Sequence, residues 1–70
     1  MTPKQFAMKR NGDKGRLTNV QNVLIDLLDG KTLVDEEKLK LEGPLVAVRG
    51  VLLMWDGNYL KAKKRAGVRG

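Results

Sequence analysis

The sequence predicts an α+β domain in which two N-terminal helices pack on a small antiparallel sheet that ends in a β-hairpin. Two segments near the N-terminus carry the polar caps and, in the second, the apolar spacing of helices. A later segment is rich in strand-forming residues, and an Asp-Gly pair, a strong hairpin signal, follows it directly. The 70 residues are enough for a single small domain, residues 1–70, with one modest core.

The first predicted helix begins at the N-terminus of the chain. Thr2 is a suitable cap, Pro3 fits the first helical position, and Gln5 stands where the second partner of a capping box belongs. The helix is expected to stop at Asn11, because a polar, glycine-rich stretch follows, and residues 11–15 are read as a loop.

The second predicted helix repeats this capping signature at Thr18 and ends at Asp29-Gly30. Behind the cap, apolar residues recur with the spacing of one helical face: Val20, Val23, Leu24, Leu27 and Leu28. Residues 35–42 allow two interpretations. Asp35 could cap a short helix, whereas the alternation of Lys38 to Glu42 with period two is typical of a half-buried strand.

Two strands are expected next, at residues 45–48 and 51–55, since Val, Leu and Trp dominate them. Gly50, between the two, marks a bulge or bend. These residues also make up most of the longest apolar stretch, which Arg49 interrupts and which is shorter than the roughly 20 residues of a membrane span.

A hairpin is expected at residues 55–58, because Asp56-Gly57 suits a type I′ turn with positive φ at both central positions. Residues 58–63 would then form the return strand. From about Arg65 the chain is expected to continue as a flexible basic tail.

The positive charge lies at the two ends of the chain. Residues 1–16 carry +4, residues 17–60 carry −3 and residues 61–70 carry +5, giving the net charge of +6. A near-neutral body with two cationic ends is suited to an anionic partner. The candidate partner-binding residues are Lys4, Lys9, Arg10, Lys14, Arg16, Lys61, Lys63, Lys64 and Arg65.

Several classes of function are disfavoured by composition. The chain has no Cys and no His, which argues against disulfides, thiolate metal sites, Cys nucleophiles and His-based acid–base catalysis. No apolar signal-peptide core follows the basic N-terminus. We therefore expect a cytoplasmic, non-enzymatic protein without cofactor or metal.

One carboxylate cluster, Asp35-Glu36-Glu37 with Asp26 and Asp29, could be considered for Mg²⁺ or for acid catalysis. Asp26 and Asp29 fall on the polar side of an amphipathic helix, where carboxylates serve solubility. The cluster is therefore interpreted as a solvated face.

Two features keep nucleic acid open as a partner. Gly12-Asp13-Lys14-Gly15 between two helices resembles the loop with which KH domains clamp nucleotides. On a strand, Lys61, Lys63 and Arg65 would share one face and could follow a phosphate backbone or an acidic peptide. Charges that protect an edge strand from aggregation explain the same run equally well.

The chain as a whole resembles the small transcription regulators that bacteriophages direct against host RNA polymerase, of the type found in a Xanthomonas phage. The resemblance lies in its size, in its lack of Cys and His, and in the basic stretches Lys4–Arg10 and Tyr59–Arg65. It implies binding to the N-terminal region of the polymerase β′ subunit near the RNA exit channel. It also implies inhibition of initiation, suppression of termination and action in the bacterial host cytoplasm, with nascent RNA nearby.

Overall fold

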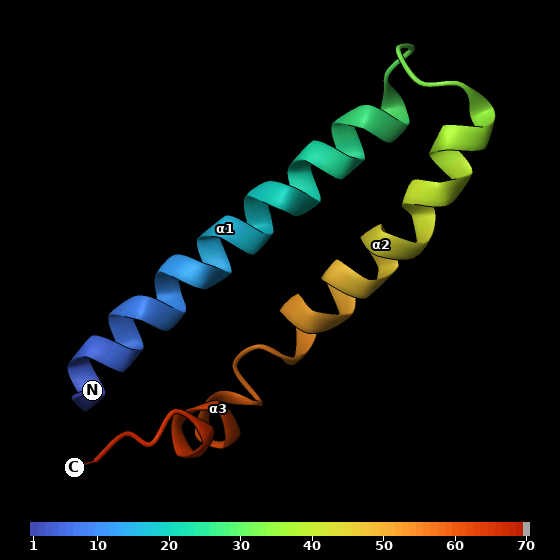
Figure 1. Cartoon of the computed structure of the whole chain (residues 1–70). Helices are drawn as coiled ribbons and strands as arrows, with labels where there is room; N and C mark the ends of the chain where they lie inside the picture. Colours follow the sequence, from blue (N-terminus) through green and yellow to red (C-terminus); the bar gives the residue numbers. More distant parts are fainter. Residues whose placement is uncertain (70) are drawn as a thin grey trace.

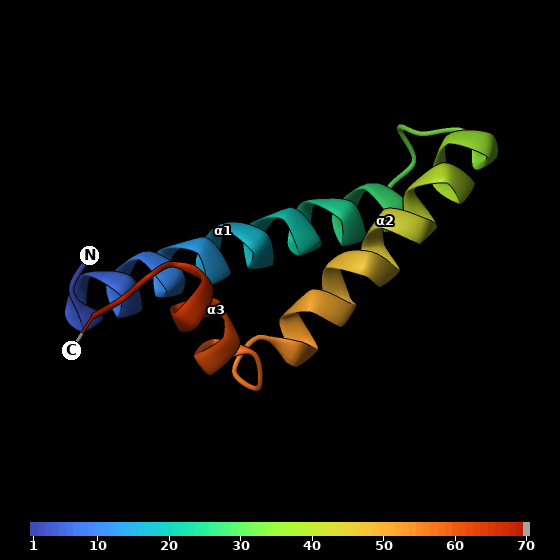
Figure 2. The same ribbon diagram turned by 60° about the horizontal axis from the view of Figure 1, so that its bottom comes forward.

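Three helices make up the fold: α1 (Pro3–Asp29), α2 (Asp35–Met54) and α3 (Tyr59–Arg65). The computed structural model describes residues 1–69. α1 and α2 form an antiparallel hairpin, and α3 turns back towards the first half of α1, so that both termini lie at one end of the molecule (Figures 1 and 2). The molecule is a rod of 50 × 16 × 14 Å. The α+β prediction was wrong, because residues 1–69 contain helices and no strand.

α1 begins as the sequence predicted and continues much further. The Thr2 hydroxyl accepts a hydrogen bond from the Gln5 backbone N–H at 3.2 Å, and the Gln5 side chain accepts one from the Thr2 N–H at 2.9 Å. The helix then runs through residues 11–15 without a break, so the expected loop is absent. Thr18 caps nothing; it lies inside the helix and its hydroxyl donates to the Lys14 carbonyl at 2.8 Å. The predicted end at Asp29-Gly30 is confirmed.

Gly12 and Gly15 provide a test of the continuous helix. Neither has positive φ, and a Cβ at either position would meet no atom within 4 Å. We expect the double substitution Gly12→Ala with Gly15→Ala to raise the free energy of unfolding by about 1–2 kcal/mol, because alanine loses less backbone entropy in a helix. Thermal and urea unfolding followed by circular dichroism measure this change.

The control for this prediction is Gly67→Ala. Gly67 has a φ of 68°, which alanine adopts only with strain, so this variant should be less stable than the natural chain. A loss of stability in the Gly12/Gly15 variant, similar to that of Gly67→Ala, would show that residues 11–15 form a turn instead.

α2 covers both the ambiguous segment 35–42 and the two predicted strands. Its first turn carries three carboxylates, which stabilise a helix N-terminus, and Glu37 accepts a hydrogen bond from the Val34 N–H at 3.0 Å. Apolar residues with helical spacing face α1 and are half-buried or buried: Leu41, Leu45, Val48 and Leu52. This periodicity outweighs the strand propensity of the valines. Pro44 lies inside α2, where it leaves the Lys40 carbonyl without its usual helical donor.

Asp56-Gly57 does form a turn, but it joins two helices instead of two strands. Gly57 does not have the positive φ that a type I′ turn needs, and the Asn58 N–H donates to the Met54 carbonyl at 3.0 Å. Residues 59–65 are helical, so the predicted return strand is absent, and α3 ends at Arg65, where the tail was expected to begin. Gly67 and the following N–H donate to the last carbonyls of α3, which is a Schellman cap.

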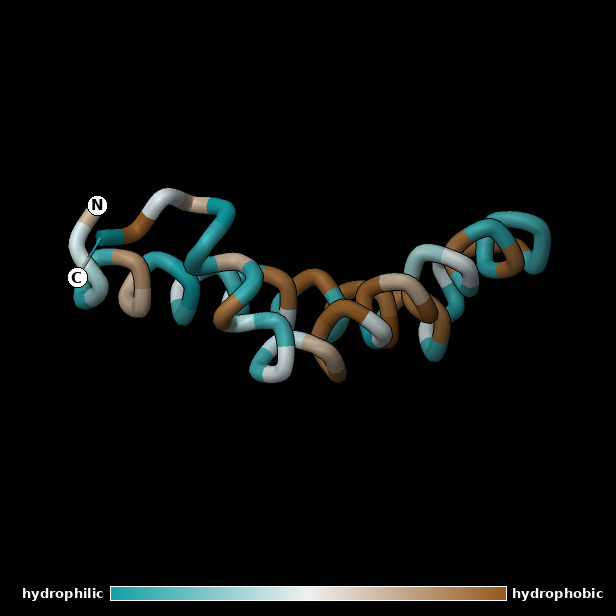
Figure 3. Tube along the Cα trace, turned by 90° about the horizontal axis from the view of Figure 1, so that it is seen from below, coloured by the Kyte–Doolittle hydropathy of each residue, from teal (hydrophilic) through white to brown (hydrophobic). Residues whose placement is uncertain are grey.

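Very little of the molecule is buried. Phe6 and Leu45, 7% and 8% exposed, are the buried residues of the described chain. Hydrophobic residues concentrate in the middle of the rod, and hydrophilic residues gather at its ends (Figure 3). Within residues 1–69 no helix combines the length and apolar character needed to cross a bilayer.

Candidate basic binding site

Folding brings the two cationic ends of the sequence together. Phe6 on α1 packs against Tyr59 on α3 edge to face, with ring centroids 5.4 Å apart. This contact holds α3 beside the first turns of α1. We call the resulting surface, residues 3–16 together with α3, the basic end; it includes all nine candidate partner-binding residues.

Arg10 connects the basic end to Trp55, the residue that directly follows α2. Its Nη2 donates a hydrogen bond of 2.7 Å to the Trp55 carbonyl, and its guanidinium carbon lies 4.2 Å from the centroid of the Trp55 ring. A charged hydrogen bond of this kind contributes about 1.5–3 kcal/mol, and cation–π stacking adds to it. Arg10 is therefore as much a structural residue as a candidate contact.

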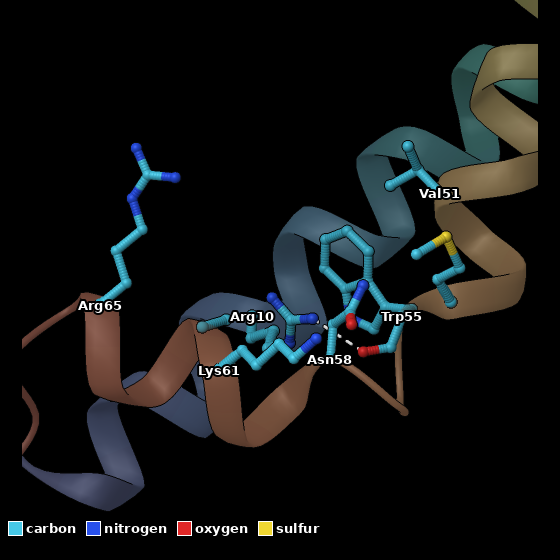
Figure 4. Close-up of a pocket in the computed structure, with 8 residues that line it drawn as sticks. Arg10, Val51, Trp55, Asn58, Lys61 and Arg65 are labelled. Atoms are coloured by element: carbon cyan, nitrogen blue, oxygen red, sulfur yellow. Dashed lines mark hydrogen bonds between the residues drawn. The ribbon is translucent and has the colours of Figure 1, made fainter.

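A pocket of about 490 Å³ opens between α1, the end of α2 and α3. Its lining residues include three cations and no acid: Arg10, Val51, Met54, Trp55, Asn58, Lys61, Ala62 and Arg65. Figure 4 shows the Arg10 guanidinium next to the Trp55 indole. Arg65 stands apart from both, one turn of α3 beyond Lys61. The pocket thus pairs positive charge with an aromatic and aliphatic wall.

The buried Nε of Arg10 has no hydrogen-bond partner among the described residues. An unsatisfied buried donor of a charged group is costly, so an acceptor oxygen that reached it would be favoured. Carboxylate and phosphate oxygens both match a guanidinium. The pocket is therefore suited chemically to an anionic group attached to an apolar one.

Three other candidate partner-binding residues of α1 form ion pairs within the protein. Lys9 and Arg16 approach Asp13 at 3.1 and 3.7 Å, and Lys14 approaches Asp56 at 3.7 Å. These pairs are exposed and contribute little to stability. Their cations stay accessible on the surface, as do Lys4 and Lys64.

The predicted strand face of Lys61, Lys63 and Arg65 does not exist. On α3, Lys61 and Arg65 are four residues apart and share the pocket, whereas Lys63 points to another side of the helix. The expected phosphate-tracking stripe is thus replaced by two cations that line the same pocket as Arg10, with Lys61 the nearer of the two (Figure 4).

Six of the eight acidic residues lie towards the opposite end of the rod. Residues 25–42, here called the acidic tip, carry a net charge of −3 and contain Asp26, Asp29, Asp35, Glu36, Glu37 and Glu42. Among residues 1–69 no group of carboxylates is arranged to hold a metal ion. The Gly12–Gly15 segment is helical and offers no nucleotide-clamping loop.

Sequence reasoning missed Asn58 and Met54 as pocket residues, and it assigned Trp55 to a strand beside a hairpin. The Arg10–Trp55 contact joins residues 45 positions apart, and no local pattern signals it. Only the helical spacing of Lys61 and Arg65 could have indicated that these two cations act together.

In comparisons with known proteins, no family model, curated protein or solved structure matches the chain.

Proposed function

We propose that the protein is a non-enzymatic regulator that binds bacterial RNA polymerase through its basic end. The observation that carries the proposal is the union of two cationic segments, far apart in the sequence, around one pocket. A surface of this charge attracts an acidic partner over long range and then contacts it directly. The resemblance to phage regulators directs the proposal to the β′ N-terminal region near the RNA exit channel.

A protein partner is favoured over nucleic acid by the composition of the pocket. Trp55, Met54 and Val51 give it an apolar wall beside Arg10 and Lys61. Aromatic and Arg residues of this kind anchor protein interfaces, whereas phosphate backbones are held mainly by exposed cations. An acidic residue next to an apolar one on a polymerase surface fits this combination.

The mechanism is occlusion. With the basic end attached, the remainder of the 50 Å rod projects from the attachment point and presents the acidic tip. Such a projection excludes other factors from the neighbouring surface, which accounts for inhibited initiation. Altered contacts near the exit channel account for suppressed termination. The site of action is then the cytoplasm of the bacterial host.

Charge reversal at the basic end tests the proposal. Lys61→Glu with Arg65→Glu changes the net charge by −4 and should weaken binding to purified Xanthomonas RNA polymerase at least tenfold, since each lost interface ion pair is worth about 1 kcal/mol or more. The matched control is Lys31→Glu with Lys40→Glu, which makes the same change at the acidic tip and should bind almost normally. Interferometry at moderate salt, after nuclease treatment, measures both affinities.

Equal losses in the two variants would mean that only overall charge matters and would contradict the proposal. The second candidate, an RNA- or DNA-binding module, predicts a different result. In that case nuclease abolishes capture, polymerase does not bind, and affinity for nucleic acid falls steeply with salt. Promoter-dependent initiation and terminator read-through, measured with and without the protein, then decide whether bound protein regulates transcription.

A further inference from the structure

α2 carries an apolar stripe on a side that α1 does not cover. Leu39, Val46 and Leu53 follow one another at intervals of seven residues and are 65%, 69% and 87% exposed. Seven residues are close to two helical turns, so the three side chains lie in one line. Leu45, which packs on α1, lies about 100° away around the helix. The stripe is therefore a second face of α2, distinct from the hairpin interface.

The surroundings of this stripe are shaped for another helix. Gly43 and Gly50 lie on the side of the stripe away from α1, where a Cβ would meet nothing within 4 Å, so a neighbouring backbone could approach closely. On the α1 side, Arg49, Leu52, Leu53 and Gln21 line a hollow of about 290 Å³. A leucine from an approaching helix could enter this hollow as a knob enters a hole.

Charges beside the stripe indicate which helix covers it. Glu42 and Arg49 lie on the same flank of the stripe, one on each side of Val46 along the helix, and neither forms an ion pair within residues 1–69. A two-fold axis at Val46 reverses the order of residues in a second α2. Glu42 of each copy then meets Arg49 of the other, while Leu39 of each copy reaches Leu53 and the hollow beside it.

The ends of the rod are complementary in the same arrangement. An antiparallel partner places its acidic first turn, Asp35 to Glu37, level with the turn that leads into α3 of the other copy. Cations of the basic end stand close to that turn, with Lys61 on the first helical turn of α3. A parallel pairing would instead set basic end against basic end. Asp56 in that turn is itself paired with Lys14 at 3.7 Å, so the Glu42–Arg49 pairs and the avoided contact between two basic ends select the antiparallel arrangement.

From these observations we infer that two copies of the chain associate through α2 as an antiparallel, two-fold symmetric dimer. The interface consists of Leu39, Val46 and Leu53, the two glycines, and reciprocal Glu42–Arg49 pairs. It is isologous, because each copy presents the same surface to the other. Val51 of the basic pocket lies about 200° around α2 from Leu53, so this wall of the pocket faces away from the dimer interface. Two basic ends then point in opposite directions.

Oligomeric state in solution tests the inference. Light scattering coupled to size exclusion should give twice the chain mass of 7.8 kDa for the natural protein. Val46→Glu should give the monomer mass, because it puts a carboxylate at the two-fold axis. Val23→Glu is the matched control: Val23 is an exposed valine on α1 outside this surface, and the variant should remain dimeric. Circular dichroism verifies that both variants keep their helices.

A charge exchange tests the arrangement itself. Glu42→Arg alone and Arg49→Glu alone should each raise the dimer Kd at least tenfold in sedimentation experiments, because like charges then face each other twice. The double variant Glu42→Arg with Arg49→Glu restores opposite pairs and should return the Kd to within about threefold of the natural value. A natural chain that stays monomeric at every concentration, a larger oligomer, or no recovery in the double variant would overturn the inference.

Discussion

Replacing Phe6 with alanine is expected to release α3 from the molecule and to lower the free energy of unfolding by about 3–5 kcal/mol, the usual range for a buried phenylalanine. Phe6 is only 7% exposed and supplies the ring on which Tyr59 packs. α3 has seven residues, too few to remain helical by itself. The variant should therefore lose the basic end as an ordered surface, and with it partner binding, and its unfolding transition should move to much lower urea or be lost.

Hydrogen exchange across residues 59–65 measures this release directly, and urea unfolding followed by Trp55 fluorescence measures the loss of stability. Met8→Ala is the matched control, because Met8 lies on the same helix and is 67% exposed. It should change stability by less than about 0.5 kcal/mol. Protected α3 amides in the Phe6 variant would show that the edge-to-face contact does not hold the helix.

Leu45→Ala is expected to affect the whole rod. Leu45 is the one buried residue of α2, at 8% exposure, and its loss should cost about 2–5 kcal/mol. A domain of this size has a total stability of only a few kcal/mol, so most molecules of the variant should be unfolded at 37 °C or lack a cooperative transition. Thermal unfolding at several protein concentrations, followed by circular dichroism, measures the effect.

The control for this second prediction is Leu60→Ala on α3. It makes the same chemical change at a leucine that is 74% exposed, and the helix propensity changes equally. Its transition should nearly coincide with that of the natural chain. Equal destabilisation by the two variants would mean that Leu45 is not the centre of the hairpin core.

The first helix shows how far local signals reach. The cap at Thr2 and the end at Gly30 were predictable, because each depends on residues close in sequence. The apolar face predicted behind Thr18 is confirmed in its three leucines, which are half-buried, whereas its two valines are exposed. Residues 11–15 were read as a loop because two glycines and an asparagine favour turns locally. In the structure this stretch stays helical, since both flanking segments of α1 are held by tertiary contacts: Phe6 by α3 and the later apolar residues by α2.

The prediction for the second half of the chain was wrong for a different reason. Valines and the Asp56-Gly57 pair favour strands and a hairpin when judged by propensity alone. The helical spacing of Leu41, Leu45, Val48 and Leu52 was present in the same segment and decides the fold, because it builds the face that pairs with α1. The turn was located correctly, but the elements on both sides of it were not.

The candidate site was predictable in its charges and not in its geometry. The nine candidate cations, all of the Lys and Arg at the two ends of the sequence except Arg69, lie together at one end of the rod. Their convergence depends on contacts such as Arg10 with Trp55, which join segments that no sequence window covers together. The pocket and its apolar wall follow from those contacts alone.

The basic end and the acidic tip lie further apart than the distance over which exposed charges interact at the salt concentration of a cell. At physiological salt the screening length is about 8 Å, whereas the rod is 50 Å long. A partner at the basic end therefore experiences mainly the +9 of residues 1–16 and 61–70, which Asp56 beside Lys14 lowers to +8, and not the net +6 of the whole chain. In dilute salt, about 0.01 M, screening extends to roughly 30 Å and the two ends begin to act together as one electric dipole. Ionic strength thus determines whether the molecule behaves as two separate charged bodies or as a single one.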